Sequence, residues 1–161
     1  MNCNNLTVTQ IFNKLHREIY RFMHPKLWMH ELQINGIPKI VGTKYLKLGY
    51  NVSINDKVFL QCGGGITIGN NVTLSRGCTI LTEGLNVENY SLNSKKKYRD
   101  HVSNPVIIGD GVWIAANVTV CPGSVIPNNC VVAAGACVVG KLKESNCLYG
   151  GIPARKIRML E

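Results

Sequence analysis

The chain has 161 residues, a length that suits one domain with a continuous hydrophobic core. Its formal net charge of +9 favours an anionic partner. No helix-turn-helix, zinc-finger spacing or aromatic RNA-binding signature accompanies that charge, so we do not expect nucleic acid to be the partner.

The cysteine content points to the compartment. Seven cysteines occur without a CxxC pair, which indicates a reducing, cytoplasmic environment. We predict no metal site, because the histidines lack neighbours at metal-ligand spacing. No secretory signal peptide and no apolar run of bilayer-spanning length is visible.

Residues 1–34 predict a helical N-terminal segment. From Thr7 the apolar residues keep helical spacing until Pro25 ends the helix. One interpretation is a helix that caps the open end of the solenoid predicted below. The other is an interfacial helix that touches an anionic membrane through residues 7–30, since basic residues and Trp28 accompany the apolar ones. The second interpretation would hold the protein at the inner face of the membrane.

A six-residue period dominates the C-terminal half. Its aliphatic anchors recur without a slip: Ile108, Ile114, Val120, Ile126, Val132 and Val138. Neither an α-helix nor a simple hairpin repeats at six, whereas each hexapeptide of a parallel β-helix supplies one flat side and one corner. Three sides make a triangular coil of about eighteen residues, with the anchors stacked inside. We predict an all-β solenoid over residues 35–149.

The same phase begins earlier in the chain. Leu48, Ile54 and Leu60 keep it, and then the run 63–65, three glycines, inserts two extra residues before the phase resumes. Glycine supplies the backbone angles that a bulged corner needs. We interpret the run as an insertion without a role of its own.

The phase then breaks and restarts only at Ile108, which predicts one excursion loop over about residues 82–105. A long loop held at both ends by a rigid scaffold is a usual place for binding and catalysis. It carries His101, the only histidine outside the N-terminal segment, which makes it the catalytic candidate. The alternative is a solvated loop histidine. We predict substrate contacts from Glu83 and Asn86.

Residues 150–161 form a basic tail after the repeat decays. A glycine pair and a proline turn let the backbone approach a ligand closely, and the cations of Arg155 and Lys156 suit phosphate groups. The alternative is a solvated basic end.

Three blocks, in this order, resemble the hexapeptide-repeat acetyltransferases, and within them the maltose/galactoside and capsular-polysaccharide O-acetyltransferase branch. The run 105–114 resembles PVxIGDxVWIG, the run 131–139 resembles VVAAGSVV, and the run 150–157 resembles GGxPAKxI. The resemblance covers residues 48–158. It implies a left-handed β-helix, usually a homotrimer. Its implied activity is transfer of acetyl from acetyl-CoA to a hydroxyl of a sugar or of a surface or capsular polysaccharide precursor.

The same resemblance implies roles for individual residues. Four small residues would flank the pantetheine arm of acetyl-CoA in the groove between two subunits: Ala115, Ala133, Ala134 and Gly151. Arg155 and Lys156 would meet the CoA phosphates. Trp113 would contact the acceptor, and its alternative role is to fill the trimer interface.

One departure from the family concerns the base. Many relatives carry a catalytic histidine early in the loop, in runs resembling T-x-x-H-D or D-x-H-P, and the stretch 81–87 has none here. We predict that His101 is the general base and that no acyl-enzyme forms, with a carboxylate of Glu83, Glu88 or Asp100 orienting its imidazole. Two alternatives stay open: N-acetylation of an amino sugar or nucleotide sugar, and a catalytically inactive scaffold subunit.

Overall fold

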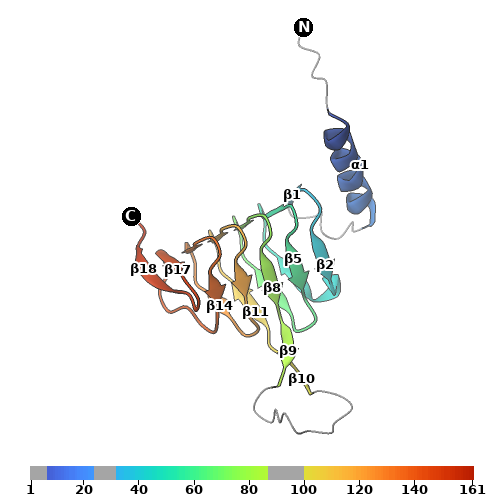
Figure 1. Cartoon of the computed structure of the whole chain (residues 1–161). Helices are drawn as coiled ribbons and strands as arrows, with labels where there is room; N and C mark the ends of the chain where they lie inside the picture. The colour runs from blue at the N-terminus through green and yellow to red at the C-terminus, as the bar shows by residue number, and fades with distance from the viewer. Residues whose placement is uncertain (1–6, 24–31, 87–99) are drawn as a thin grey trace.

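The computed structural model of the chain is a triangular parallel β-helix preceded by one helix (Figure 1). The structure describes residues 7–23, 32–86 and 100–161. The predicted fold, a left-handed β-helix with a short N-terminal helical segment and one excursion, is confirmed.

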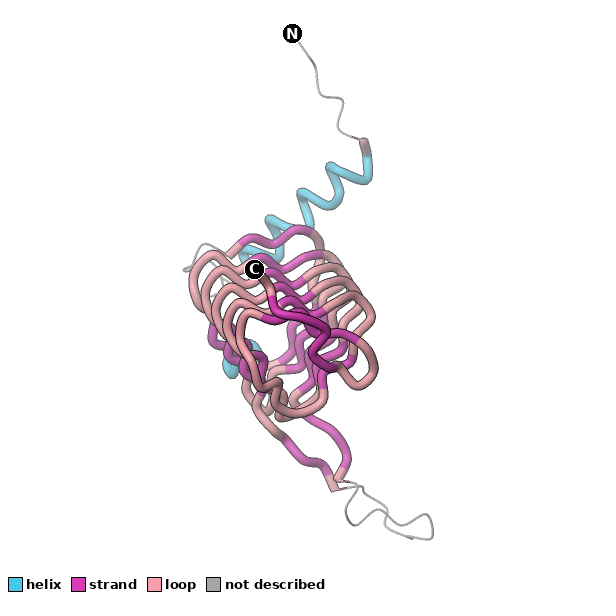
Figure 2. Tube along the Cα trace, turned by 90° about the vertical axis from the view of Figure 1, so that its left-hand side faces the viewer, coloured by secondary structure: helices cyan, strands magenta, loops and turns pink. Residues whose placement is uncertain are grey.

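Three sheets form the faces of the prism, and Figure 2 looks along its axis. Face A contains the following strands: β1 (Gln33–Asn35), β4 (Ser53–Asn55), β7 (Thr73–Leu74), β12 (Trp113–Ile114), β15 (Val131–Val132), β17 (Cys147–Gly150) and β18 (Arg155–Met159). Face B contains β2 (Lys39–Val41), β5 (Phe59–Gln61), β8 (Thr79–Leu81), β13 (Thr119–Val120) and β16 (Cys137–Val138). Face C contains β3 (Leu46–Leu48), β6 (Ile66–Ile68), β11 (Val106–Ile108) and β14 (Val125–Ile126). The chain visits A, B and C in turn, and among the described strands of these three faces only β18 runs antiparallel to its neighbour.

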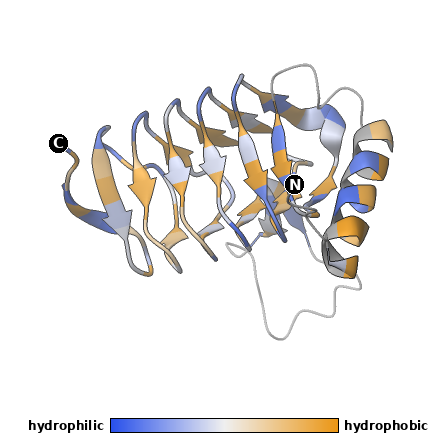
Figure 3. Ribbon diagram, turned by 90° about the horizontal axis from the view of Figure 1, so that it is seen from above, coloured by the Kyte–Doolittle hydropathy of each residue, from blue (hydrophilic) through white to orange (hydrophobic). Residues whose placement is uncertain are grey.

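The core of the prism follows the predicted six-residue period. All six C-terminal anchors are at most 1% exposed, and Figure 3 shows apolar residues along the strands of the solenoid. Full burial of one aliphatic side chain stabilises the fold by about 1.5–3 kcal/mol. Ser124 occupies a core position too, and its buried hydroxyl donates to the carbonyl of Val138 at 3.1 Å. A polar atom is therefore tolerated inside because it has a partner.

Coil length changes along the solenoid, as the glycine insertion predicted. Asn51 donates through Nδ2 to Oδ1 of Asn71, 20 residues later, at 2.8 Å. In the C-terminal coils the step is 18 residues, since the amide of Asp110 donates to Oδ1 of Asn128. These asparagines lie on one corner, where Asn51 and Asn71 have φ values of 53° and 56°. Asparagine tolerates this left-handed conformation and bonds its neighbour in the next coil.

The helix α1 (Val8–Met23) precedes the first strand, β1, which begins at Gln33. Six apolar side chains of α1 are between 48% and 88% exposed: Val8, Ile11, Phe12, Leu15, Ile19 and Phe22. In the single chain these apolar side chains of α1 are therefore exposed, and a cap over the end of the solenoid stays a prediction. Trp28 lies outside the described residues. Within the described segments, no helix combines the length and the apolar character that crossing a bilayer requires.

The predicted excursion leaves the corner between faces B and C (Figures 1 and 2). Its base is a two-stranded antiparallel ribbon of β9 (Glu83–Leu85) and β10 (His101–Ser103), which we call the arm. Residues 87–99, including the candidate Glu88, lie outside the described part of the chain.

Candidate active site

The base of the arm is anchored to the solenoid through Thr82, whose side chain is fully buried. Its Oγ1 donates to the carbonyl of Gln61 at 2.6 Å and accepts from the amide of Gly64 at 2.9 Å. On the other strand, the amide of Asn104 donates to the carbonyl of Thr82 at 2.8 Å. Because a buried polar group without a partner costs about 1–3 kcal/mol, these bonds fix where the arm leaves the prism.

The base of the arm packs against the glycine run 63–65, which we call the seat of the arm. A Cβ on Gly63 would collide with the carboxylate of Glu83, and a Cβ on Gly64 would lie 2.8 Å from the carbonyl oxygen of Thr82. Any larger residue would displace the arm. The interpretation of the run as an insertion without a role is therefore wrong, because the extra residues make a flat corner against which the arm packs.

The register of the arm brings specific side chains together. His101 lies opposite Leu85, and Ser103 lies opposite Glu83. The amide of Asn86 donates to the carbonyl of Asp100 at 2.9 Å, so the neighbouring pair of His101 and Leu85 is a non-hydrogen-bonded one. In such pairs the Cα atoms are about 4.5 Å apart and the side chains are closest. We call the set Glu83, Leu85, His101 and Ser103 the histidine face of the arm.

This register separates the residues that the sequence had grouped. Glu83 shares the histidine face with His101, as a diagonal neighbour within reach of a long side chain. Asp100 and Asn86 lie on the opposite face of the ribbon, because side chains alternate along a strand. Of the two carboxylates that the structure describes, Glu83 and Asp100, the geometry favours Glu83 for orienting the imidazole.

The register also shows how His101 relates to the position of the family's early loop histidine, which this chain lacks. When Thr82 takes the position of the threonine in the T-x-x-H-D run, the histidine of that run falls on position 85, which is leucine here. His101 is the direct cross-strand partner of position 85 and is exposed. An imidazole from the other strand thus projects from the same face of the arm as the family's histidine would.

Trp113 lies elsewhere on the prism. It projects from β12 on face A, is 51% exposed, and donates through Nε1 to Oγ of Ser75 at 2.9 Å. The arm leaves from the corner opposite face A, between faces B and C. Within one chain the structure therefore does not bring Trp113 and His101 together.

The small residues predicted to flank a cofactor stack at one corner, between faces A and B. The pairing of β12, β15 and β17 sets Ala115, Ala133 and Gly150 in one row. A Cβ on Gly150 would lie 3.3 Å from the Cβ of Ala133. Ala134 and Gly151 follow immediately along the chain, and both are exposed. The row, which we call the small-residue corner, is half-buried at Ala115 and Ala133 and is covered by Ile157 at the buried Gly150.

The two predicted phosphate ligands differ in their surroundings. Lys156 Nζ forms an ion pair with Oε2 of Glu144 at 2.6 Å, and this hydrogen bond raises the pKa of Lys156. Arg155 donates through Nη1 only to the adjacent carbonyl of Ala154, and it has no ion pair within the described segments. Arg155 is therefore the cation with free charge, while that of Lys156 is largely compensated.

Sequence reasoning missed two further cations at the same end. A hollow of about 350 Å³ lies beside β18, and Lys141 and Lys143 line it together with Arg155 and Lys156. The signal was present in the run 141–144, where the repeat decays into Lys-Leu-Lys-Glu. Arg155, Lys141 and Lys143 form no ion pair with another described residue, and three such cations around one hollow favour an anionic ligand.

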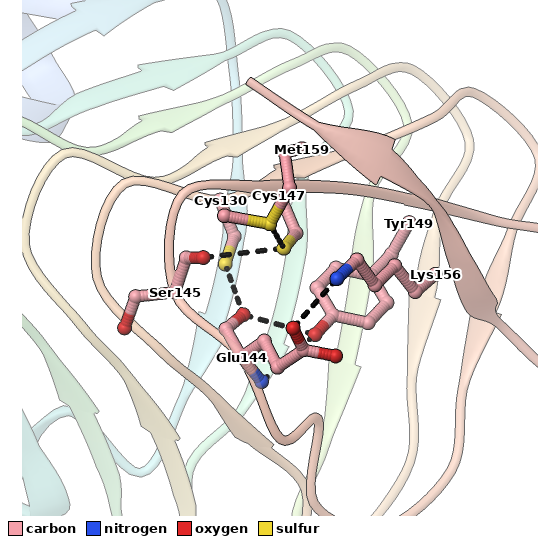
Figure 4. A network of polar contacts seen from close by, with 7 residues as sticks. All are labelled: Cys130, Glu144, Ser145, Cys147, Tyr149, Lys156 and Met159. Atoms are coloured by element: carbon pink, nitrogen blue, oxygen red, sulfur yellow. Dashed lines mark hydrogen bonds and ion pairs between the residues drawn. The ribbon is translucent and has the colours of Figure 1, made fainter. Parts of the chain in front are cut away.

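A polar network holds this end together (Figure 4). The hydroxyl of Tyr149 donates to the carbonyl of Glu144 at 2.9 Å and accepts from its amide at 3.0 Å. The thiol of Cys130 donates to the same carbonyl at 3.4 Å. Burial raises the pKa of Tyr149, which therefore stays a neutral donor. The turn that carries the two lysines is thus fixed against β17.

Three of the described cysteines are poor nucleophiles. Burial raises the pKa of Cys62, Cys78 and Cys121 to about 11, so their thiolates are scarce at neutral pH. Cys121 and Cys137 approach each other at 3.7 Å between their Sγ atoms on face B. Among the residues that the structure describes, no three His, Cys, Asp or Glu side chains gather as metal ligands would.

The left-handed β-helix places the chain in the class of hexapeptide-repeat solenoid proteins, and its distinguishing features are the histidine-bearing arm and the basic terminal strand. No protein-family model matches the chain. Curated proteins do: the chain is 33% identical over 113 residues to the "Putative lipopolysaccharide biosynthesis O-acetyl transferase WbbJ" of Escherichia coli K12, covering 67% of this chain. It spans 57% of that relative's length.

A second relative and a solved structure agree. The chain is 30% identical over 125 residues to the "Putative colanic acid biosynthesis acetyltransferase WcaF" of Escherichia coli K12, with 70% of this chain and 68% of the relative covered. The crystal structure of a maltose O-acetyltransferase from Clostridium difficile 630 has a TM-score of 0.77 at 26% identity, covering 95% of this chain and 82% of that one. The chain belongs to the hexapeptide-repeat acetyltransferases.

Proposed function

We propose that this chain is an O-acetyltransferase that moves acetyl from acetyl-CoA to a hydroxyl of a sugar or of a surface polysaccharide precursor, with His101 as general base. The observation that carries the proposal is the pairing of His101 with position 85 on the arm. Membership of the family supports acetyl transfer. The names of WbbJ and WcaF, which refer to lipopolysaccharide and colanic acid biosynthesis, support a carbohydrate acceptor.

The chemistry is a direct transfer. The imidazole of His101 accepts the hydroxyl proton while the hydroxyl oxygen forms a bond to the thioester carbonyl carbon. Collapse of the tetrahedral intermediate breaks the C–S bond, and the imidazolium returns the proton to the leaving CoA sulfur. The products are an acetate ester and free CoA. Glu83, on the same face of the arm, stabilises the imidazolium while it exists.

A direct transfer without an acyl-enzyme agrees with the state of the thiols. A cysteine nucleophile would need a lowered pKa, and burial has the opposite effect on Cys121, the partly exposed one of the three with a pKa of about 11. The proton of the acceptor hydroxyl must then go to another base, and His101 is the exposed imidazole of the arm.

We place the complete site between two subunits of a homotrimer. His101 and Trp113 belong to different parts of one prism, so a neighbouring copy has to supply one of them to a shared acceptor. The pantetheine arm of acetyl-CoA would run along the small-residue corner, past the exposed residues Ala134 and Gly151. Its phosphates would meet Arg155, Lys141 and Lys143, with Lys156 in a lesser role because Glu144 compensates it.

The helix α1 supports a proposal about location. Its apolar side chains are exposed, and the exposed cation Lys14 lies on the same helix, a combination that suits the surface of an anionic membrane. Sedimentation of the full chain with vesicles of phosphatidylglycerol, but not with vesicles of phosphatidylcholine, would support it. Equal recovery from both supernatants would contradict it.

One observation favours a second candidate function, that of an inactive scaffold subunit. Position 85, on which the histidine of the T-x-x-H-D run falls when its threonine is laid on Thr82, is leucine here. A scaffold would keep the trimer and lose the chemistry.

One experiment separates the two functions. The purified chain is incubated with acetyl-CoA and a panel of methyl glycosides, release of CoA thiol is followed, and the molar mass is measured by light scattering. The proposal requires a mass of about three chains and thiol release that depends on a glycoside. A trimer that binds CoA but acetylates no glycoside would establish the scaffold function, and a stable monomer would exclude the shared site.

A further inference from the structure

Leu85 is the direct cross-strand partner of the proposed base, and nothing in the proposed reaction uses it. It lies directly opposite His101 in a non-hydrogen-bonded pair, the arrangement in which cross-strand side chains are nearest. It is 44% exposed, although it is an aliphatic residue on a ribbon that projects from the prism. An acceptor hydroxyl that reaches the imidazole therefore also reaches an apolar surface.

The surroundings of the imidazole are asymmetric. On one side of the histidine face stands the isobutyl group of Leu85. On the other side stand Glu83, whose carboxylate packs on the Gly63 corner, and Ser103 opposite it. A sugar ring that presents one hydroxyl to His101 must lay one of its substituents toward Leu85.

A hydroxymethyl group in that position would lose hydrogen bonds to water and find no partner on leucine, whereas a methyl group would gain apolar contact. Hexoses and 6-deoxyhexoses differ in this group alone. The methyl carbon of a 6-deoxyhexose is bonded to C5, which is adjacent to the C4 that carries the 4-hydroxyl. The methyl group can therefore face Leu85 while the 4-hydroxyl faces His101.

We propose that Leu85 is a specificity-determining residue and that the acceptor class is 6-deoxyhexosides. This inference rests on the proposed function and deepens it, since it names the sugar class of that same site. Apolar contacts of one carbon in a site discriminate by about 10- to 200-fold in kcat/KM, and rejection of an added hydroxyl by such a surface reaches about 100-fold.

The test uses matched acceptors that differ only at carbon 6: methyl α-D-fucoside against methyl α-D-galactoside, and methyl 6-deoxy-α-D-glucoside against methyl α-D-glucoside. The full-length chain should prefer the 6-deoxy member of at least one pair by about tenfold or more in kcat/KM. Leu85→Ser should bring that ratio close to one while the KM for acetyl-CoA stays unchanged. Leu85→Met should keep the preference, because it keeps an apolar side chain of similar volume.

Ile37→Ser is the matched control, since it removes a 40% exposed aliphatic side chain far along the chain from the arm. It should leave the acceptor ratio as in the unaltered protein. Equal kcat/KM within both pairs, or an unchanged ratio in Leu85→Ser, would overturn the inference and leave the proposed function standing. Dissociation of the trimer in Leu85→Ser would reassign Leu85 to the subunit interface. Failure of the unaltered protein to acetylate any glycoside would instead overturn the proposed function itself.

Discussion

The solenoid and the arm are two regions built on opposite rules. In the solenoid each coil repeats the one below, and anchors such as Ile114 are fully buried. Within each face, the strands of successive coils are hydrogen-bonded to one another. The arm occurs once, is a ribbon of two short strands, and exposes both His101 and Leu85. Redundant burial supplies rigidity, and the single projecting ribbon carries the proposed catalytic histidine, which occurs once and not in every repeat.

The largest expected effect concerns the arm. His101→Ala should lower kcat by about 10²- to 10⁴-fold, the range for loss of a general base, while the trimer and CoA binding persist. Steady-state kinetics with light scattering and calorimetry measure the three quantities. His16→Ala makes the same chemical change on α1 and should leave kcat unaltered. Full turnover in His101→Ala would move the base to another group.

The solenoid should respond in stability instead. Ile114→Ala removes a fully buried anchor and should lower the free energy of unfolding by about 2–5 kcal/mol. Denaturant titration measures it. Ile107→Ala, at a 45% exposed position of the same solenoid, is the control and should cost much less. A similar loss in both variants would mean that exposure in the single chain does not reflect burial in the assembly.

The joint between the two regions offers a sharper test. Gly64→Ala places a Cβ 2.8 Å from the carbonyl oxygen of Thr82 and should destabilise the seat of the arm by about 1–3 kcal/mol. Gly84→Ala on the arm meets nothing closer than Pro122 Cγ at 4.0 Å and should be tolerated. Hydrogen exchange of the arm amides compares the two. Equal protection of the arm amides in both variants would contradict the claim that the arm packs against the glycine run 63–65.

The smallest expected effect is on CoA binding, and it should distinguish the adjacent cations Arg155 and Lys156. Arg155→Ala should weaken CoA binding by about tenfold or more, since a charge-assisted hydrogen bond contributes about 1.5–3 kcal/mol. Lys156→Ala should cost less, because the charge of Lys156 is already compensated by Glu144. Calorimetric titration with CoA decides the order. The reverse order would show that CoA displaces Glu144 from Lys156.

Much of the fold was accessible from the sequence. The six-residue period predicted the solenoid and its anchors, because in a parallel β-helix each inward position is set by local spacing alone. The break after Ile80 predicted the excursion, and the block resemblance predicted the family that the comparisons then confirmed. The prediction of a helix in the N-terminal segment was also right, since apolar spacing of 3.6 residues is a local property.

The candidate site was less accessible, because its side chains meet through pairings that no local spacing records. The sequence named His101, yet only the antiparallel register of β9 and β10 set it against position 85 and put Asn86 on the other face. It named Lys156, yet only the fold of the last turn brought Glu144 to it. The sequence determined by itself which residues point inward, because burial repeats with the coil. Which exposed residues face one another was decided only by the tertiary structure, since contacts between distant segments depend on register and on where the chain leaves the repeat.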